Sequence, residues 1–118
     1  KRPREHDDNH LHWIRSLPCL VTGRTDNFEA AHIRYSDVRF AKREVGMQEK
    51  PDDRWTVPLH RDQHKDQHTE NEKAWWMKIG IDPVTVALAL RNVSGDDEAA
   101  GVILAQARTA RNKSLDRT

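Results

Sequence analysis

Cysteine is almost absent from this chain, in which Cys19 is the one such residue among 118. A single cysteine can form neither a disulfide within the chain nor a CxxC metal knuckle, so the usual signs of an oxidising compartment and of a zinc ribbon are missing. Any metal bound here must therefore be held by histidine and carboxylate side chains.

Long apolar runs are lacking as well. No segment approaches the roughly 20 apolar residues that span a bilayer, and the first residues carry no apolar stretch of the signal-peptide kind. Apolar residues make up 36% of the chain and charged residues 33%. We therefore expect one cytoplasmic domain with a thin core and a heavily charged surface.

An excess of charge of one sign is also missing, because 20 Lys and Arg face 19 Asp and Glu, for a net charge of +1. Bulk charge thus neither predicts nor excludes nucleic acid as a partner. Basic residues do surround a histidine-rich centre, but acidic residues are interleaved with them. A local basic surface and an ordinary mixed-charge face both remain open; the basic residues concerned are Arg34, Arg39, Lys42, Arg43, Lys50, Arg54, Arg61 and Lys65.

The N-terminal part predicts a loose arm and then a helix. Residues 1–5 are charged and contain a proline, which favours an arm. A helix should begin at Asp7 or Asp8, which are good N-caps, and end at Pro18. Its apolar face follows the helical period at His10, Trp13, Ile14 and Leu17.

Two short apolar segments, 19–23 and 28–35, flank a Gly/Thr/Asp/Asn cluster and predict a β-hairpin. Residues 36–54 have no clean period and predict a long irregular loop. Segment 55–59 contains Pro58, which favours a strand end entering a helix over a central strand.

Helices are predicted for the remainder of the chain. Residues 60–68 fit the first, and the second should start at Thr69 or Asn71 and stop at Gly80. A third is capped by Asp82, with Pro83 at its first position, and runs to about Arg91. A last helix should follow Ser94, with acids in its first turn and basic residues in its last.

Histidines recur every fourth residue at His60, His64 and His68. This spacing places side chains on one helix face, so neighbouring members can bind one metal ion. His60 and His68 would lie about 12 Å apart along the axis, too far to share an ion easily. With His32 on a predicted strand, the pattern suits metal-assisted hydrolysis, in which a neutral imidazole takes a proton from water.

The segments "FEAAHIRY" and "DDRWTVPLHRDQHKDQH" resemble the motif of the HNH (ββα-metal) endonucleases. With "LPCLVTG" and "NEKAWW", they look like the phage and prophage branch that includes the Ref recombination nucleases. The resemblance implies an α+β fold: a ββα-metal core of a short hairpin and a metal-binding helix, flanked by an N-terminal helix and C-terminal helices. One nuclease domain would cover residues 1–118, with a core of about 11–83 and a helical extension of about 84–113.

The resemblance also assigns roles to single residues. His32 matches the general base of the family, and His64 and His68 match the ligands of one divalent ion, of which Zn, Mg, Mn and Ni are all candidates. Glu29 stands three positions before the base, as a glutamate does in the colicin-type members, where it would orient a nearby Arg or His.

The chain departs from the family pattern at three points. The cysteine positions that hold a structural zinc in some relatives read Cys19, Thr22 and His60 here, so we expect no second, structural zinc.

The other two departures concern the active site. Ala31 precedes the base, where relatives supply another metal ligand, so water or phosphate must complete the coordination, or a group such as His60, Asp37 or Asp53 must reach in. Trp55 occupies the place of the motif's middle Asn. We expect Trp55 to be core, with an aspartate just before it, Asp52 or Asp53, holding the base-bearing loop by hydrogen bonds; Asp53 is the one assigned to the site.

The function expected from these observations is metal-dependent hydrolysis of DNA phosphodiesters in a bacterial or phage-infected cell. Phosphate contacts are assigned to Arg34, Arg61 and Lys65, and no base-reading motif is present, which favours nonspecific or structure-guided cutting. Trp13, Trp75 and Trp76 are expected to serve packing. The alternative is a catalytically inactive DNA-binding or partner-docking module, and in Ref nucleases the implied partner is RecA on DNA.

Overall fold

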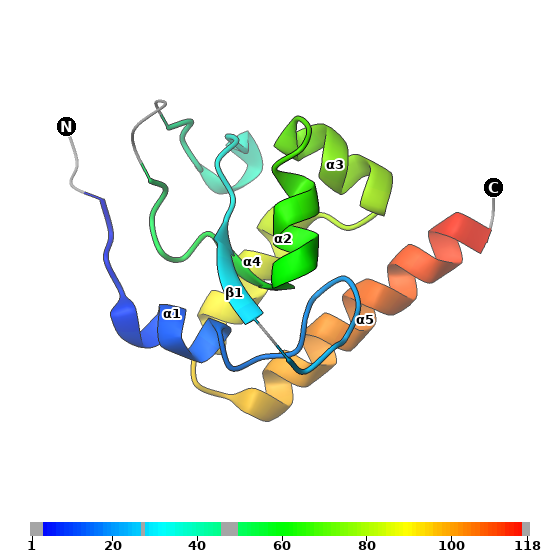
Figure 1. Ribbon diagram of the computed structural model, residues 1–118. Helices are drawn as coiled ribbons and strands as arrows, with labels where there is room; N and C mark the ends of the chain where they lie inside the picture. Colours follow the sequence, from blue (N-terminus) through cyan, green and yellow to red (C-terminus); the bar gives the residue numbers. More distant parts are fainter. Residues whose placement is uncertain (1–3, 27, 46–49, 117–118) are drawn as a thin grey trace.

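A computed structural model describes residues 4–26, 28–45 and 50–116 of the chain, with the side chains of residues 112–116 left aside. The elements in order are α1 (Asp8–Ile14), β1 (Phe28–His32), the 3-10 helix η1 (Val38–Phe40), β2 (Thr56–His60), α2 (Arg61–Gln67), α3 (Glu72–Ile79), α4 (Pro83–Asn92) and α5 (Asp97–Asp116). Figure 1 shows the two strands at the centre of an α+β fold, with helices around them. None of the described helices combines the length and the apolar character that crossing a membrane requires.

The sheet has two antiparallel strands, β1 and β2, in a register that pairs Phe28 with His60 and His32 with Thr56. Every residue of β2 is buried, including Pro58 in its middle. Pro58 cannot donate to a ladder, but its carbonyl accepts a hydrogen bond from the Leu20 N–H at 2.9 Å. β2 leads directly into α2, which confirms the prediction of a strand end entering a helix for this segment.

The predicted hairpin between segments 19–23 and 28–35 is wrong. Segment 19–23 is a closed turn, in which Cys19 N–H donates to the Arg24 carbonyl and Gly23 N–H to the Cys19 carbonyl. Gly23 has φ +75°, a left-handed backbone that favours glycine. β1 pairs instead with β2, and residues 33–55 connect the two strands. Apart from η1, the described part of this connection is irregular, as predicted; residues 46–49 lie outside the described part.

The helix ends follow the predicted capping residues. Asp7 caps α1 by accepting from His10 N–H, and α1 ends at Ile14, earlier than Pro18. Asn71 caps α3, and Gly80 ends it with φ 87°. Asp82 caps α4, with Pro83 at its first position. His60 caps α2, so this helix is one residue shorter at each end than predicted.

The N-terminal arm is docked where it can be described. Residues 1–3 lie outside the described part, but Arg4 Nε donates to the Pro51 carbonyl at 2.8 Å and Glu5 N–H to Asp52 Oδ1 at 2.8 Å. A loose arm is therefore wrong for Arg4 and Glu5, because the loop before β2 supplies acceptors that no local pattern reveals.

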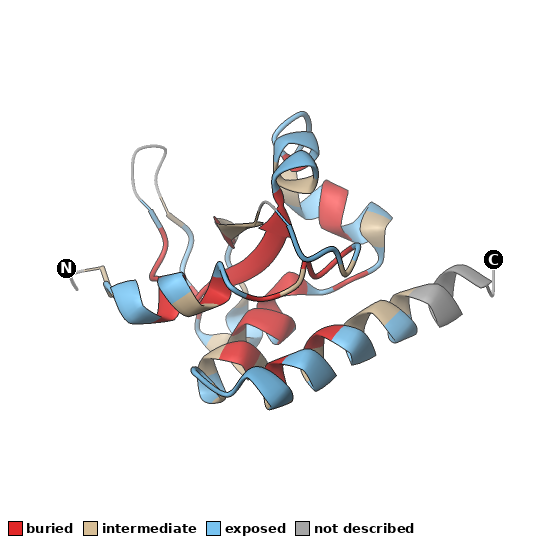
Figure 2. Cartoon of the chain, turned by 60° about the horizontal axis from the view of Figure 1, so that its bottom comes forward, coloured by how far each residue is buried: buried red, intermediate tan, exposed pale blue. Residues whose placement is uncertain are grey.

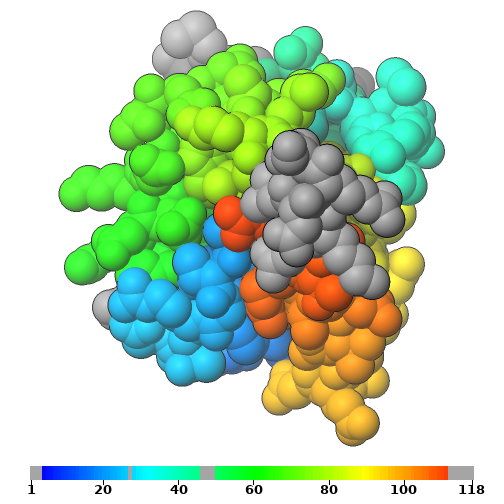
Figure 3. Space-filling view, turned by 90° about the vertical axis from the view of Figure 1, so that its right-hand side faces the viewer, coloured from blue at the N-terminus to red at the C-terminus, as the bar shows by residue number. Residues whose placement is uncertain are grey.

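The core lies between the sheet and the helices. Trp75 and Trp76 are fully buried and meet edge to face, with ring centroids 4.9 Å apart, and Trp55 is buried too. Figure 2 shows buried residues along β2 and on one side of the long C-terminal helix α5. The other side of α5 is exposed. Figure 3 shows the turn of residues 19–26 beside α5, where Arg108 donates to the Cys19 carbonyl at 3.0 Å.

Candidate active site

His32 and Asp53 form a hydrogen-bonded pair at the end of β1. Nε2 of His32 lies 3.0 Å from Oδ1 of Asp53, and the Asp53 side chain is 1% exposed against 21% for His32. A carboxylate only accepts hydrogen bonds, so Nε2 carries the ring proton. Nδ1 is therefore the nitrogen that remains able to accept a proton.

The Asp53 carboxylate is held from three sides. Besides His32, Arg4 Nη2 lies 2.5 Å from Oδ1, and the Asp7 backbone N–H donates to Oδ2 at 2.7 Å. Burial alone would raise the pKa of Asp53, but the hydrogen bonds from Asp7 and His32 and the charge of Arg4 outweigh it and leave the pKa lowered. Asp53 thus stays an ionised acceptor at neutral pH.

The environment of His32 favours its neutral form. Burial lowers the pKa of His32 most strongly, and the nearby charges of Arg4 and Lys50 act in the same direction. The hydrogen bond to Asp53 and its negative charge raise the pKa, but do not cancel the effect of burial. A neutral imidazole fixed in one tautomer is the form that a general base needs.

Glu29 and His64 form a second pair, between β1 and α2. Glu29 Oε1 lies 2.7 Å from His64 Nδ1, and both side chains are partly exposed. Because the carboxylate accepts, Nδ1 carries the proton and Nε2 keeps the lone pair. This is the outer carboxylate partner that metal-binding histidines commonly have.

His68 lies beside His64 on the same helix face, with ring centroids 4.8 Å apart. Two imidazoles that bind one ion through nitrogens at about 2.0–2.1 Å place their ring centres about 5 Å apart. The ring spacing is compatible with one divalent ion, so His64 and His68 are the residues that could hold it. No group of three or more His, Cys, Asp or Glu side chains suited to a metal occurs in the described part of the chain.

Ala31 occupies the position at which the HNH resemblance implies another metal ligand. It is buried and shares a strand face with Glu29, since side chains alternate along a strand. Glu29 contacts His64, and the Arg34 N–H contacts Glu72 at 3.0 Å, so α2 and α3 follow β1 in the same direction.

The two histidine pairs lie on opposite faces of β1. Successive side chains of a strand point to opposite faces, so His32 points away from the face of β1 that carries Glu29 and Ala31. Within the described residues, the His32 ring bonds Asp53 and not the histidines of α2. A substrate that touches both pairs must cross the edge of β1 that faces away from β2.

The other residues considered as a third ligand are engaged elsewhere. His60 caps α2 by accepting from Asp62 N–H through Nδ1 at 3.1 Å. Asp37 binds Arg39, and Asp53 binds His32. The described structure brings none of the three to the His64 and His68 pair.

The basic surface is smaller than the sequence suggests. Lys42 is buried and donates to the Tyr35 carbonyl at 2.6 Å, Arg39 pairs with Asp37 and Asp82, and Arg54 pairs with Glu5. Arg61 and Lys65 are exposed on α2. Arg34 is half-buried just beyond β1. The cations best placed for a phosphate are therefore those on α2.

Arg4 is the residue at this site that the sequence reasoning missed. Its only signal was charge complementarity with Asp52 and Asp53, which many pairs share in a chain that is one-third charged. The contact joins residues 49 positions apart, so only the tertiary structure could select it.

Comparison with known proteins identifies a family rather than an activity. No curated protein and no solved structure gives a significant match to the chain. Residues 1–94, which run from the N-terminal arm through α4, match the model of DUF968, a family described as a protein of unknown function. This match covers well over half of the sequence, and the chain therefore belongs to the DUF968 family.

Proposed function

We propose that this protein is a metal-dependent DNA endonuclease of the HNH type that hydrolyses phosphodiester bonds. The observation that carries the proposal is the His32 and Asp53 pair, in which a buried carboxylate fixes the tautomer of a partly exposed imidazole of lowered pKa. The paired imidazoles of α2 and the strand–strand–helix order support it. The finer likeness to Ref nucleases rests on sequence motifs alone.

His32 acts as the base in this proposal. Its Nδ1 accepts a proton from a water molecule whose oxygen bonds to phosphorus, while the bond from phosphorus to the leaving oxygen breaks. Asp53 holds the ring and stabilises the imidazolium that forms, because its carboxylate bonds the opposite nitrogen at 3.0 Å. Proton transfer of this kind contributes about 10²–10⁴-fold to a rate.

His64 and His68 would hold the divalent ion, with water and phosphate oxygens in the remaining positions. When bound, the ion would supply positive charge to the phosphate and the leaving oxygen. Glu29 orients His64 by accepting from its Nδ1. Two imidazoles favour the later transition metals in affinity, although Mg and Mn also remain candidates for turnover.

The DNA backbone would run over the edge of β1 that faces away from β2, passing from the His64 and His68 pair on one face of the strand to His32 on the other. Arg61 and Lys65, exposed on α2, would contact flanking phosphates, and Arg34 would do so from the end of β1. Such contacts give affinity without sequence preference and make binding strongly dependent on salt.

A second candidate is a DNA-binding or partner-docking module that keeps this fold without catalysis. Ala31 favours it, because a buried methyl group stands where a third ligand would be needed. A RecA-coated DNA filament as partner stays a prediction from the sequence resemblance.

Plasmid nicking separates the two candidates. Supercoiled DNA is incubated with the protein across a series of divalent ions, with a chelator control, for the wild type and for His32→Ala. His12→Ala is the matched control, because His12 is exposed on α1. The endonuclease proposal expects metal-dependent nicking that His12→Ala keeps and His32→Ala loses.

Two other outcomes contradict the proposal in different ways. Nicking that survives His32→Ala rejects the assignment of the base. Absence of nicking with every ion, while the protein still binds DNA, favours the non-catalytic module. Repeating the assay with added RecA and single-stranded DNA tests the filament as an activating partner.

A further inference from the structure

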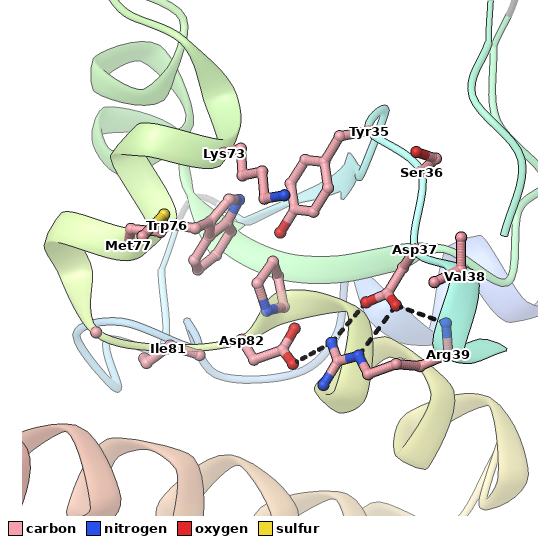
Figure 4. A pocket seen from close by; sticks show the side chains of 12 residues that line it. Tyr35, Ser36, Asp37, Val38, Arg39, Lys73, Trp76, Met77, Ile81 and Asp82 are labelled. Atoms are coloured by element: carbon pink, nitrogen blue, oxygen red, sulfur yellow. Dashed lines mark hydrogen bonds and ion pairs between the residues drawn. The ribbon is translucent and has the colours of Figure 1, made fainter.

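A cavity of about 620 Å³ opens next to the end of β1, between the segment Tyr35–Arg39, α3 and the turn that leads into α4. Figure 4 shows Tyr35, Lys73 and Trp76 along one wall and Asp37, Arg39 and Asp82 along another. No residue of this cavity takes part in the two histidine pairs. Its size lies in the range of ligand pockets.

One wall offers hydrogen-bond donors. Trp76 Nε1–H is buried and has no hydrogen-bond partner among the residues that the structure describes. In Figure 4 the indole nitrogen faces the space between the side chains of Lys73 and Tyr35. Burial and the carboxylates of Asp82, Glu72 and Asp37 raise the pKa of Tyr35, so its hydroxyl stays protonated and able to donate. A ligand for this wall must bring an acceptor, because an unpaired buried N–H is costly.

The rest of the cavity is apolar or already neutralised. Val38 and Met77 line it and are 93% and 75% exposed, unusual for large apolar side chains. The carboxylates of Asp37 and Asp82 both bind Arg39, at 2.5 and 2.7 Å, so they present little free negative charge. Lys73 Nζ lies over the Tyr35 ring, 5.9 Å from its centroid, and is the cation left at the mouth.

The position of the cavity relative to His32 narrows the class of ligand that it could bind. Tyr35 follows His32 by three residues, just beyond the end of β1, so their Cα atoms lie at most about 10 Å apart. Glu72, the first residue of α3, accepts from the Arg34 N–H and so ties the cavity wall to the end of β1. About 10 Å corresponds to a few nucleotides at about 3.4 Å per base. A strand lying over the edge of β1 would therefore reach the cavity.

We propose that this cavity binds one unpaired nucleotide of a DNA strand held at the candidate active site. The base would lie against the Tyr35 ring and beside the exposed Met77 side chain, and Lys73 would contact the adjoining phosphate. Trp76 Nε1–H is closed to solvent in this structure, and it would donate to a keto oxygen once the entering base displaces the Lys73 side chain. A paired base cannot enter, since its faces are stacked and its edge is bonded. The inference rests on the proposed function and makes single-stranded or locally unpaired DNA the substrate form.

The test is binding by NMR, in chelator so that cutting plays no part. The full chain, labelled with ¹⁵N, is titrated with a short oligothymidylate, and the indole N–H signals are followed. Trp75 is an internal control on the same helix, because its Nε1–H already donates to Asp66 at 2.9 Å. The proposal expects the Trp76 signal to shift and the Trp75 signal to stay.

Two lysine variants and an abasic strand test whether binding depends on this cavity and on the base. Lys73→Gln should weaken oligothymidylate binding by roughly tenfold, the size expected when a nucleotide loses a partner in its site. Lys78→Gln makes the same charge change on α3, outside the cavity where Lys78 pairs with Glu70, and should leave binding unchanged. An abasic strand of equal length should bind without shifting Trp76.

Several results would overturn the proposal. An unmoved Trp76 signal when binding is saturated rejects it, as does an equal shift with the abasic strand or with blunt duplex. A shift produced by a peptide that carries an apolar residue beside a carboxylate, and not by the oligonucleotide, assigns the cavity to a protein partner. None of these readouts depends on nuclease activity, so failure of the endonuclease proposal is seen separately in the nicking assay.

Discussion

Nε2 of His32 lies 3.0 Å from Oδ1 of Asp53, although the two residues are 21 positions apart in the chain. Asp53 is buried and is also bound by Arg4 and by the Asp7 backbone. The imidazole therefore has one fixed orientation and one fixed tautomer.

Asp53→Asn tests this arrangement. An amide can present its N–H to Nε2, which would force the ring proton onto Nδ1 and remove the basic lone pair. We expect the nicking rate to fall by about 100-fold, within the range that a general base contributes. The rate is measured on supercoiled plasmid under metal saturation. Asp26→Asn is the control, because Asp26 is exposed and pairs with Arg24; equal rates for both variants would contradict the role of Asp53.

Metal binding should raise the thermal stability of the protein through His64 and His68. An ion at 100 times its dissociation constant adds about 2.7 kcal/mol. His64→Ala and His68→Ala should each abolish most of the metal-induced rise in Tm, and His12→Ala should keep it. The measurement is a melting curve with and without each ion. A rise that persists in both α2 variants would place the ion elsewhere.

Ala31→Asp should tighten metal binding by about tenfold, or 1.4 kcal/mol. The HNH resemblance puts a metal ligand at this position, so in the proposed site the new carboxylate would act as a third ligand. Without metal the variant should be less stable than the wild type, because position 31 is buried and would enclose an unpaired charge. Calorimetric titration with metal measures the affinity. Unchanged affinity in a folded variant would show that position 31 does not face the ion.

Acid should destabilise the fold in two stages. Burial lowers the pKa of His10 and of His32 below the ordinary value of 6.5, so the unfolded chain takes up these protons first. Stability is then complete above about pH 6.5 and falls as the pH drops below that value. The lowered pKa values of Asp7 and Asp53 add a second loss below about pH 4, their ordinary range.

Urea denaturation from pH 8 to pH 4 measures this dependence. His32→Gln should flatten the first stage, and His12→Gln should leave it unchanged. A free energy of unfolding that does not vary between pH 7 and pH 5 would contradict the lowered pKa values of His10 and His32.

Leu104→Ala should cost about 2–5 kcal/mol of stability, because Leu104 is fully buried and, with Ala100, is part of the core on α5. Val102→Ala on the same helix removes apolar atoms at a position that is 52% exposed, and should change stability by less than about 0.5 kcal/mol. Chemical denaturation compares the two variants. Equal effects would mean that α5 does not pack as described.

Local signals in the sequence determined most helix boundaries. Asp7, Asn71 and Asp82 cap helices because a short side-chain oxygen can satisfy the first free N–H groups, and Gly80 ends α3 because glycine tolerates a left-handed backbone. The burial of Trp55, Trp75 and Trp76 also followed from residue type. The spacing of His64 and His68 already required them to share a helix face.

Strand pairing and the partners of the histidines were decided only by the tertiary structure. Apolar pattern cannot tell which of two short strands pairs with β1, and the choice of β2 over segment 19–23 depends on packing against the helices. The contacts of His32 with Asp53, of Arg4 with Asp53 and of Glu29 with His64 join residues 21 to 49 positions apart. Charge complementarity permits many such pairs, and only the folded backbone brings these particular groups within hydrogen-bond distance.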